Sequence, residues 1–83
     1  MRQVPIRRPK DLGLAVAEAR RLRRLSQAEL ADTAGIDRTY LVRLEAGLST
    51  LLVERVLRLL RRLGAELVVV LPPEEPDPGE RTS

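Results

Sequence analysis

The segment SQAELADTAGIDRTYLVRLEAG, residues 26–47, constrains the fold more than any other part of the chain. Ser26, followed three residues later by Glu29, matches a capping box and predicts a short helix that begins after the serine. Gly35 is expected to end that helix, because glycine accepts the left-handed conformation that a sharp chain reversal requires. Asp37 is then expected to cap another helix. The segment therefore predicts two short helices joined by a tight glycine turn.

Two helices joined in this way form either a DNA-binding helix-turn-helix or an ordinary hairpin of a helical bundle. At about 100° per residue, Leu41 and Leu44 define the buried face of the second helix. Thr39 and Arg43 project almost directly opposite this face, and Val42 lies beside them. Arg38, in the first turn, flanks the same exposed edge, and this outward face carries no acidic residue. Arginine can form a bidentate contact with guanine, and threonine and valine methyl groups can contact a thymine methyl. A face selected only for solubility would mix charges and would not expose valine, so the sequence favours a helix that reads DNA bases.

The charge of the chain is consistent with a polyanionic partner. Residues 1–71 contain 14 basic and 8 acidic residues and carry a net charge of +6, whereas residues 72–83 are acidic. A positive body of this kind suits nucleic acid. A solvated arginine surface is the alternative interpretation, since all but one of the 15 basic residues are arginine.

Other classes of function are disfavoured by what the sequence lacks. The chain has no cysteine and no histidine, which removes disulfides, the usual zinc clusters, thiol nucleophiles and the commonest general base. We therefore expect no enzyme, no metal site and no other cofactor. No apolar run approaches the ~18 to 20 residues that cross a bilayer, and the first residues lack the apolar segment of a secretory signal. We expect a cytoplasmic protein without a membrane partner.

Composition divides the chain into four segments. These are a flexible basic arm at 1–10, a helix-turn-helix domain at 11–64, a dimerisation strand at 65–71 and a disordered acidic tail at 72–83. Pro5 and Pro9 disfavour helix in the arm, and the proline and acidic residues of the tail predict disorder.

The helical domain is expected to be mainly α, with four to five helices. Asp11 is the expected cap of the first helix. Ser49 or Thr50 is the expected cap of the last helix, and Gly64 its end. The apolar residues of the last helix cover more than one stripe, so part of them can close the core and the surplus requires another partner.

The sequence AELVVVLPP contains a short β run that two prolines end. One strand is not stable alone, and the chain offers no second convincing strand. We therefore expect the strands of two copies to pair antiparallel across a two-fold axis. The expected dimerisation residues are Glu66, Leu67, Val68, Val69, Val70 and Leu71. The apolar surplus of the last helix is the alternative interface.

The helix-turn-helix segment resembles the phage-repressor and Cro type of helix-turn-helix, the Xre-like family. The resemblance covers residues 11–63. It rests on Ser26-Gln27, Leu30-Ala31, Gly35-Ile36 and Leu44-Glu45 followed by Gly47. Many relatives have glycine where Arg24 stands, so we expect a more continuous link between the first two helices here.

The resemblance also implies roles for individual residues. Arg38, Thr39 and Arg43 would occupy base-reading positions, and Gln27 and Tyr40 would contact the DNA backbone. Arg20 and Glu45 would form an ion pair between the first and third helices. A solvated Glu45 at a helix end is the alternative that spacing leaves open.

The order of elements, a helix-turn-helix followed by a strand and a polar tail, is similar to the HipB-like antitoxins. This likeness implies a homodimeric repressor that binds double-stranded DNA at an inverted-repeat operator in its own promoter. It also implies a HipA-like kinase toxin as a partner. The acidic tail is then either a segment that the toxin or a degrading protease recognises, or a solubilising end. A stand-alone Xre-type transcriptional regulator without a toxin is the alternative.

Overall fold

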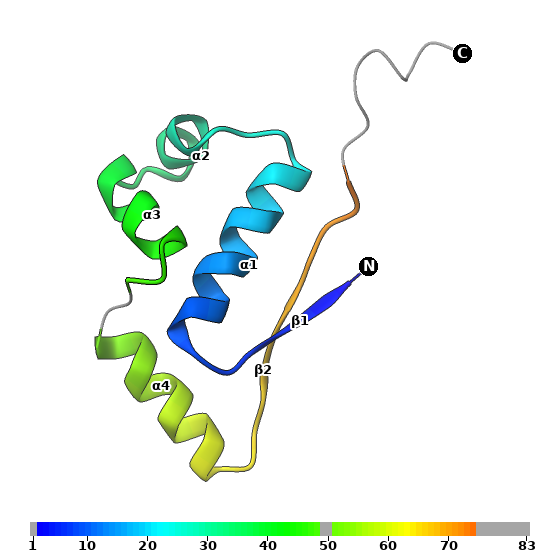
Figure 1. Ribbon diagram of the computed structural model, residues 1–83, viewed down its shortest axis with the longest axis vertical. Helices are drawn as coiled ribbons and strands as arrows, with labels where there is room; N and C mark the ends of the chain where they lie inside the picture. Colours follow the sequence, from blue (N-terminus) through cyan, green and yellow to red (C-terminus); the bar gives the residue numbers. More distant parts are fainter. Residues whose placement is uncertain (1, 49–50, 75–83) are drawn as a thin grey trace.

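The computed structural model describes residues 2–48 and 51–74. Within these residues the chain forms helices and two short strands (Figure 1). In chain order they are β1 (Gln3–Ile6), α1 (Pro9–Leu22), α2 (Gln27–Ala34), α3 (Arg38–Glu45), α4 (Leu51–Arg62) and β2 (Leu67–Val70). The predicted mainly α fold class is confirmed. In this described part, no helix is long and apolar enough to cross a bilayer.

Helix α1 begins earlier than the sequence indicated. Pro9 occupies its first position, where the missing proline N–H would have had no helical partner. Asp11, the expected cap, lies inside the first turn instead. Its carboxylate accepts hydrogen bonds from the backbone N–H groups of Arg7 and Arg8, both at 3.0 Å. These two hydrogen bonds lower the pKa of Asp11.

The link between α1 and α2 turns sharply at Arg24. Arg24 has a φ of +56°, in the left-handed region that favours glycine. Our expectation of a more continuous link is wrong, because Arg24 itself adopts the left-handed conformation and breaks the helix. For a residue with a Cβ atom, that conformation costs roughly 1–2 kcal/mol.

The caps predicted for α2 and α3 are confirmed. Ser26 Oγ accepts a hydrogen bond from Glu29 N at 3.0 Å, and Glu29 Oε1 accepts one from Ser26 N at 2.8 Å. Gly35 ends α2 with a φ of +69°. Asp37 Oδ1 then accepts a hydrogen bond from Thr39 N at 2.7 Å and begins α3. The expected caps of α4, Ser49 and Thr50, lie outside the described residues.

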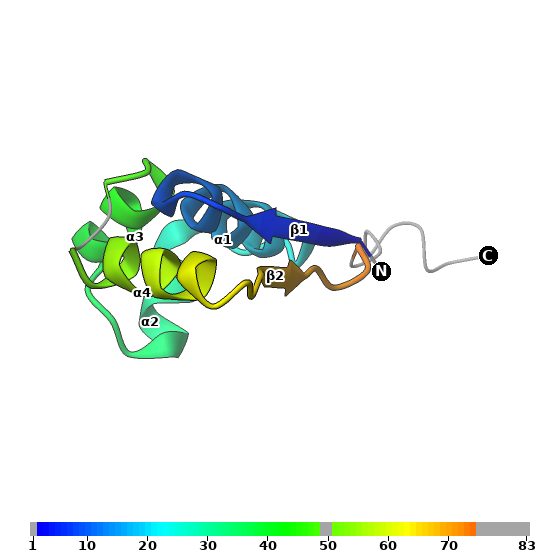
Figure 2. The same cartoon turned by 90° about the horizontal axis from the view of Figure 1, so that it is seen from below.

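The strands pair within one chain. β1 runs antiparallel to β2, with Gln3 opposite Val70 and Ile6 opposite Leu67. Figures 1 and 2 show the two strands side by side next to α1. Beyond the strands, Leu71 N donates a hydrogen bond to Arg2 O at 2.8 Å. Our expectations that the first ten residues form a flexible arm, and that the chain contains no second strand, are therefore wrong.

Residues 3–6 form a strand because buried and exposed side chains alternate along them. Val4 and Ile6 belong to the core cluster with Val69, and Ile6 is only 3% exposed. Gln3 and Pro5 point the other way and are exposed. Proline disfavours a helix but is compatible with an edge strand. Pro5 therefore argued against a helix in these residues, but not against a strand.

Helix α1 is the centre of the fold and contacts β1, α3 and α4. It lies close against α3 at Gly13, where an added Cβ atom would lie 2.1 Å from the carbonyl oxygen of Leu44. On its other side, Ala15 packs in the core cluster with Ile6 and Leu57. Since only a glycine fits at position 13 without a shift, this residue fixes the position of α3 on α1.

Candidate nucleic-acid interface

Helix α3 is anchored by one face. Leu41 is 1% exposed, and Leu44, whose carbonyl group meets Gly13, is half-buried. Because α1 and α2 both contact this helix, its orientation is set by packing as well as by its loops. A rigidly held helix can present its other face to a ligand with defined geometry.

The opposite face of α3 is exposed and basic. Arg38, Thr39 and Arg43 are all exposed, and Val42 is 39% exposed. The structure thus places the three expected base-reading residues on one open surface, together with the valine. Tyr40 is 51% exposed and lines a groove with Arg43 between α3 and the beginning of α4.

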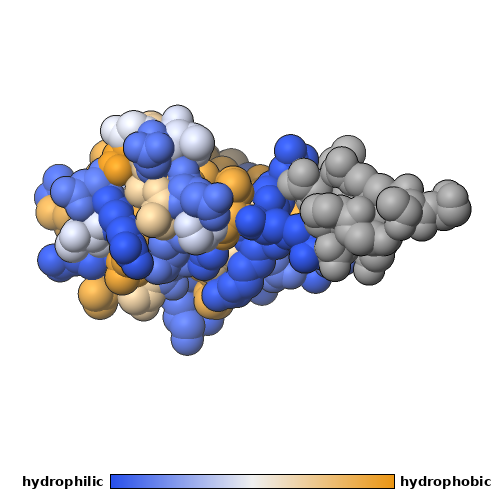
Figure 3. Space-filling view, turned by 90° about the horizontal axis from the view of Figure 1, so that it is seen from above, coloured by the Kyte–Doolittle hydropathy of each residue, from blue (hydrophilic) through white to orange (hydrophobic). Residues whose placement is uncertain are grey.

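Further exposed basic residues lie at the C-terminal end of α1. Arg21, Arg23 and Arg24 are exposed there. Figure 3 looks from above onto the end of the molecule that carries α2 and the end of α1, where hydrophilic residues lie between separate apolar groups. Exposed arginines therefore lie on α1 as well as on α3.

Arg20 and Glu45 form a bidentate ion pair between α1 and α3. Arg20 Nε lies 2.8 Å from Glu45 Oε2, and Arg20 Nη2 lies 2.9 Å from Glu45 Oε1. The two side chains are only 12% and 6% exposed. Arg20 Nη1 also donates a hydrogen bond to Leu25 O at 2.9 Å, so the same guanidinium group holds the link between α1 and α2.

The pair changes the proton affinities of both groups. The hydrogen bonds from Arg20 lower the pKa of Glu45 below its ordinary 4.5, against the opposing effect of burial. The hydrogen bond to Glu45 raises the pKa of Arg20. Both residues are therefore charged at neutral pH, and the alternative of a solvated Glu45 does not describe this structure.

Gln27 belongs to the same cluster. Its Nε2 atom donates a hydrogen bond to Glu45 Oε1 at 3.1 Å, which ties the first turn of α2 to the end of α3. A contact between Gln27 and the DNA backbone would thus be made by a side chain that Glu45 already holds in place. The phosphate contacts of Gln27 and Tyr40 stay predictions.

Gly13 is the important residue that the sequence reading missed. It does not contact a ligand, but it sets the distance between α1 and α3. The available signal was a glycine in the interior of a predicted helix, which is unfavourable unless packing requires it.

Comparison with known proteins agrees with this geometry. The HTH_3 helix-turn-helix family model matches residues 16–70. The chain is also 38% identical over 69 residues to the uncharacterized HTH-type transcriptional regulator y4mF of Sinorhizobium fredii (strain NBRC 101917 / NGR234). That match covers 83% of this chain and 91% of the relative. No solved structure matches the chain significantly. With its glycine turn, its exposed basic α3 and this family match, the chain belongs to the Xre/Cro type of helix-turn-helix family.

Proposed function

We propose that the protein is a transcriptional repressor that binds double-stranded DNA by inserting α3 into the major groove. Family membership supports DNA-binding transcriptional regulation and a non-enzymatic role. The observation that carries the more specific proposal is the exposed face of α3. Thr39 and Arg43 lie on this face almost opposite the buried Leu41, and the exposed Arg38 flanks the same face in the first turn.

The proposed roles follow from the chemistry of these side chains. Arg38 and Arg43 each offer a guanidinium fork for a guanine edge, and Thr39 and Val42 offer methyl groups for a thymine. Gln27 and Tyr40 contact phosphates and position the helix without reading sequence. The Arg20–Glu45 pair keeps α3 at a fixed orientation to α1.

We also propose a homodimer in which the β2 strands of two copies pair antiparallel. β1 pairs with one edge of β2, which leaves the other edge for a second copy and gives a four-stranded sheet. Apolar side chains are also exposed: Leu59 of α4 and Leu63, which follows the helix, are 63% and 78% exposed, and Val70 of β2 is 54% exposed. Such exposed apolar surface supports an interface between copies.

A dimer of this kind would read an inverted repeat. Two recognition helices related by a two-fold axis fit half-sites about one helical turn apart, ~34–36 Å. Selection of bound sequences from a random DNA pool tests the proposal. We expect an inverted repeat whose half-sites are centred roughly 10 base pairs apart.

Single substitutions separate base reading from general attraction. Arg38→Ala and Arg43→Ala should each cost about 1–3 kcal/mol on the selected site and relax preference at one position of each half-site. Gln27→Ala should weaken binding to all sequences alike. Selection of the same motif by the wild type and both arginine variants would contradict the assignment of α3 as the reader.

The HipB-like order of elements supports an antitoxin role as the more specific form of this function. In this form the repressor binds its own promoter and also binds a HipA-like kinase toxin. The alternative is a stand-alone Xre-type regulator. The neighbouring open reading frame distinguishes the two, because an antitoxin gene lies beside a toxin gene.

A further inference from the structure

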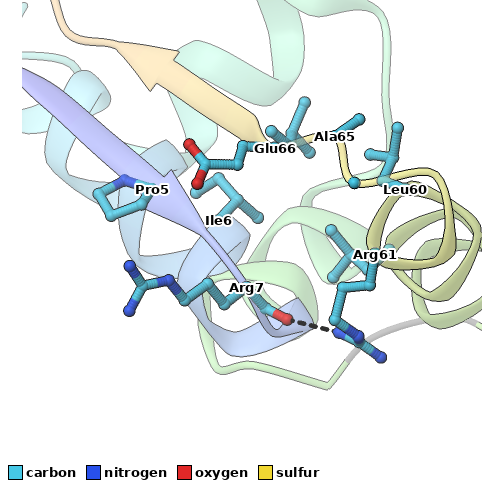
Figure 4. Close-up of a pocket in the computed structure, with 10 residues that line it drawn as sticks. Pro5, Ile6, Arg7, Leu60, Arg61, Ala65 and Glu66 are labelled. Atoms are coloured by element: carbon cyan, nitrogen blue, oxygen red, sulfur yellow. Dashed lines mark hydrogen bonds between the residues drawn. The ribbon is translucent and has the colours of Figure 1, made fainter.

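A groove of about 460 Å³ lies at the end of the molecule away from α2, where the end of β1 meets the end of α4 and the beginning of β2 (Figures 1 and 4). Its apolar lining includes Ile6, Leu57, Leu60 and Leu67. Ile6 and Leu57 are buried, whereas Leu67 is 36% exposed. This groove is remote from the proposed base-reading residues, none of which lines it.

Arginines surround the groove. Arg7 and Arg61 line it, and Arg61 Nη1 donates a hydrogen bond to Arg7 O at 3.1 Å, the dashed line in Figure 4. A neighbouring hollow shares Arg7 and Arg61 and adds Arg8 and Arg58. The acidic residues that line the groove and the hollow are Glu66 and Glu54. Four arginines therefore face two carboxylates, and the groove suits an acidic segment of chain.

The acidic segment that this protein offers is its own C-terminal end. Residues 72–83 contain four acidic residues and one arginine. Glu74, the last described residue, is exposed, and nine more residues follow it. Fully extended, these nine residues reach roughly 30 Å. The tail therefore has both the charge and the length to occupy a groove of this size.

In its own subunit the tail begins at the end of β2 that lies away from the groove. The groove lies beside Glu66 and Leu67 at the start of the strand, whereas the tail leaves from Leu71, which is bound to Arg2 at the other end. Figure 1 shows the chain running away from α4 at that point. The tail would have to reverse its direction and run back along the whole strand to reach its own groove.

The tail of a second copy would begin beside the start of β2, where the groove lies. In an antiparallel pair, the C-terminal end of one strand lies beside the N-terminal end of the other. With the two-fold axis between Val68 and Val69, the partner's Leu71 lies opposite Glu66. The partner's Glu74 then comes level with the end of α4, where Arg61 stands.

We propose that the acidic tail of each protomer docks in the arginine-lined groove of its partner, formed by Arg7, Arg61 and the apolar residues between them. This inference rests on the β2-to-β2 dimer proposed above. The partner's carboxylates pair with Arg7, Arg58 and Arg61, while the prolines of the tail lie over Leu60 and Leu67. Exposed ion pairs of this kind are individually weak, so the tail tightens the dimer without forming it.

Paramagnetic labelling tests the docking directly. The chain has no cysteine, so Ser83→Cys carries a single spin label at the end of the tail. Spin-labelled protein without ¹⁵N is mixed with ¹⁵N-labelled wild type to form mixed dimers. We expect the label to broaden the amide signals of Arg61, Ala65 and Glu66 in the ¹⁵N-labelled chain. This broadening should disappear in an Arg7→Gln/Arg61→Gln variant and remain in the control Arg62→Gln.

Sedimentation provides the second measurement. Removing residues 74–83 should raise the dimer dissociation constant about 3- to 10-fold, as expected for a few exposed ion pairs, and added salt should shrink this difference. The same truncation in the Arg7→Gln/Arg61→Gln variant should have little further effect, since the two changes remove the same contacts. Glu66→Gln should strengthen the dimer, because it removes a carboxylate that repels the tail.

The outcomes separate this inference from the dimer on which it rests. Stable dimers without broadening at the groove would overturn the docking and leave the dimer intact. Broadening only when the spin label and ¹⁵N share one chain would place the tail in its own groove and overturn the exchange between copies. A protein that stays monomeric at all concentrations would overturn both.

Discussion

Replacing Glu45 with alanine removes the carboxylate that joins three helices. Arg20 would keep only its hydrogen bond to Leu25 O, and the amide of Gln27 would lose its acceptor. Removing one partner of a buried ion pair costs roughly 3–5 kcal/mol, and an exposed pair contributes ~0–1 kcal/mol. Because the Arg20 and Glu45 side chains are 12% and 6% exposed, we expect a loss of about 2–4 kcal/mol, near the buried limit.

Thermal unfolding followed by circular dichroism measures this loss. In a domain of this size each kcal/mol shifts the melting temperature by roughly 4–8 °C, so a loss of ~3 kcal/mol lowers it by roughly 12–24 °C. Glu54→Ala is the control, because Glu54 is an exposed carboxylate on α4. Equal shifts for Glu45→Ala and Glu54→Ala would refute the reasoning.

Acidification gives the same prediction a second test. The folded pKa of Glu45 lies below its ordinary 4.5, so its contribution to stability is fully present above that value. The contribution is lost as the pH falls through the lower, folded pKa. The difference in melting temperature between wild type and Glu45→Gln should therefore be constant near neutral pH and should shrink below about pH 4.5.

Two further substitutions test the close approach of the backbone at Gly13 and the backbone conformation at Arg24. Gly13→Ala places a Cβ atom against Leu44 O. It should lower the free energy of unfolding by about 1–3 kcal/mol and weaken DNA binding. A stability equal to that of the wild type would show that α1 and α3 can move apart without cost. Arg24→Gly should be more stable than Arg24→Ala by about 1 kcal/mol in denaturant unfolding, because only glycine relieves the left-handed φ of +56°. The opposite order, which is normal for exposed sites, would contradict that conformation in solution.

The sequence predicted those features of the fold that depend on neighbouring residues. The cap of α2 uses Ser26 and Glu29, and the cap of α3 uses Asp37, so each signal lies within one turn of its helix. The exposed face of α3 followed from helical periodicity alone. Such local patterns are readable because the groups that interact are close in the chain.

Features that depend on distant residues were missed. β1 is four residues long and contains Pro5, and its strand character becomes visible only beside β2, near the other end of the chain. Gly13 has a function only because Leu44 passes over it. The conformation of Arg24 follows from the angle at which α2 leaves α1. No local pattern encodes these tertiary distances.

The pairing of Gln3 with Val70 has a consequence for biosynthesis. Residues 67–70 leave the ribosome after helices α1 to α4, so the sheet cannot form until β2 has emerged. Contacts between such distant residues also form slowly, because closing a long loop reduces chain entropy before the contacts compensate. A nascent chain can thus complete α1, α2 and α3 while Val4 and Ile6 still lack the strand that covers them. The emergence of β2 becomes the event that covers the first strand and closes the core over α1.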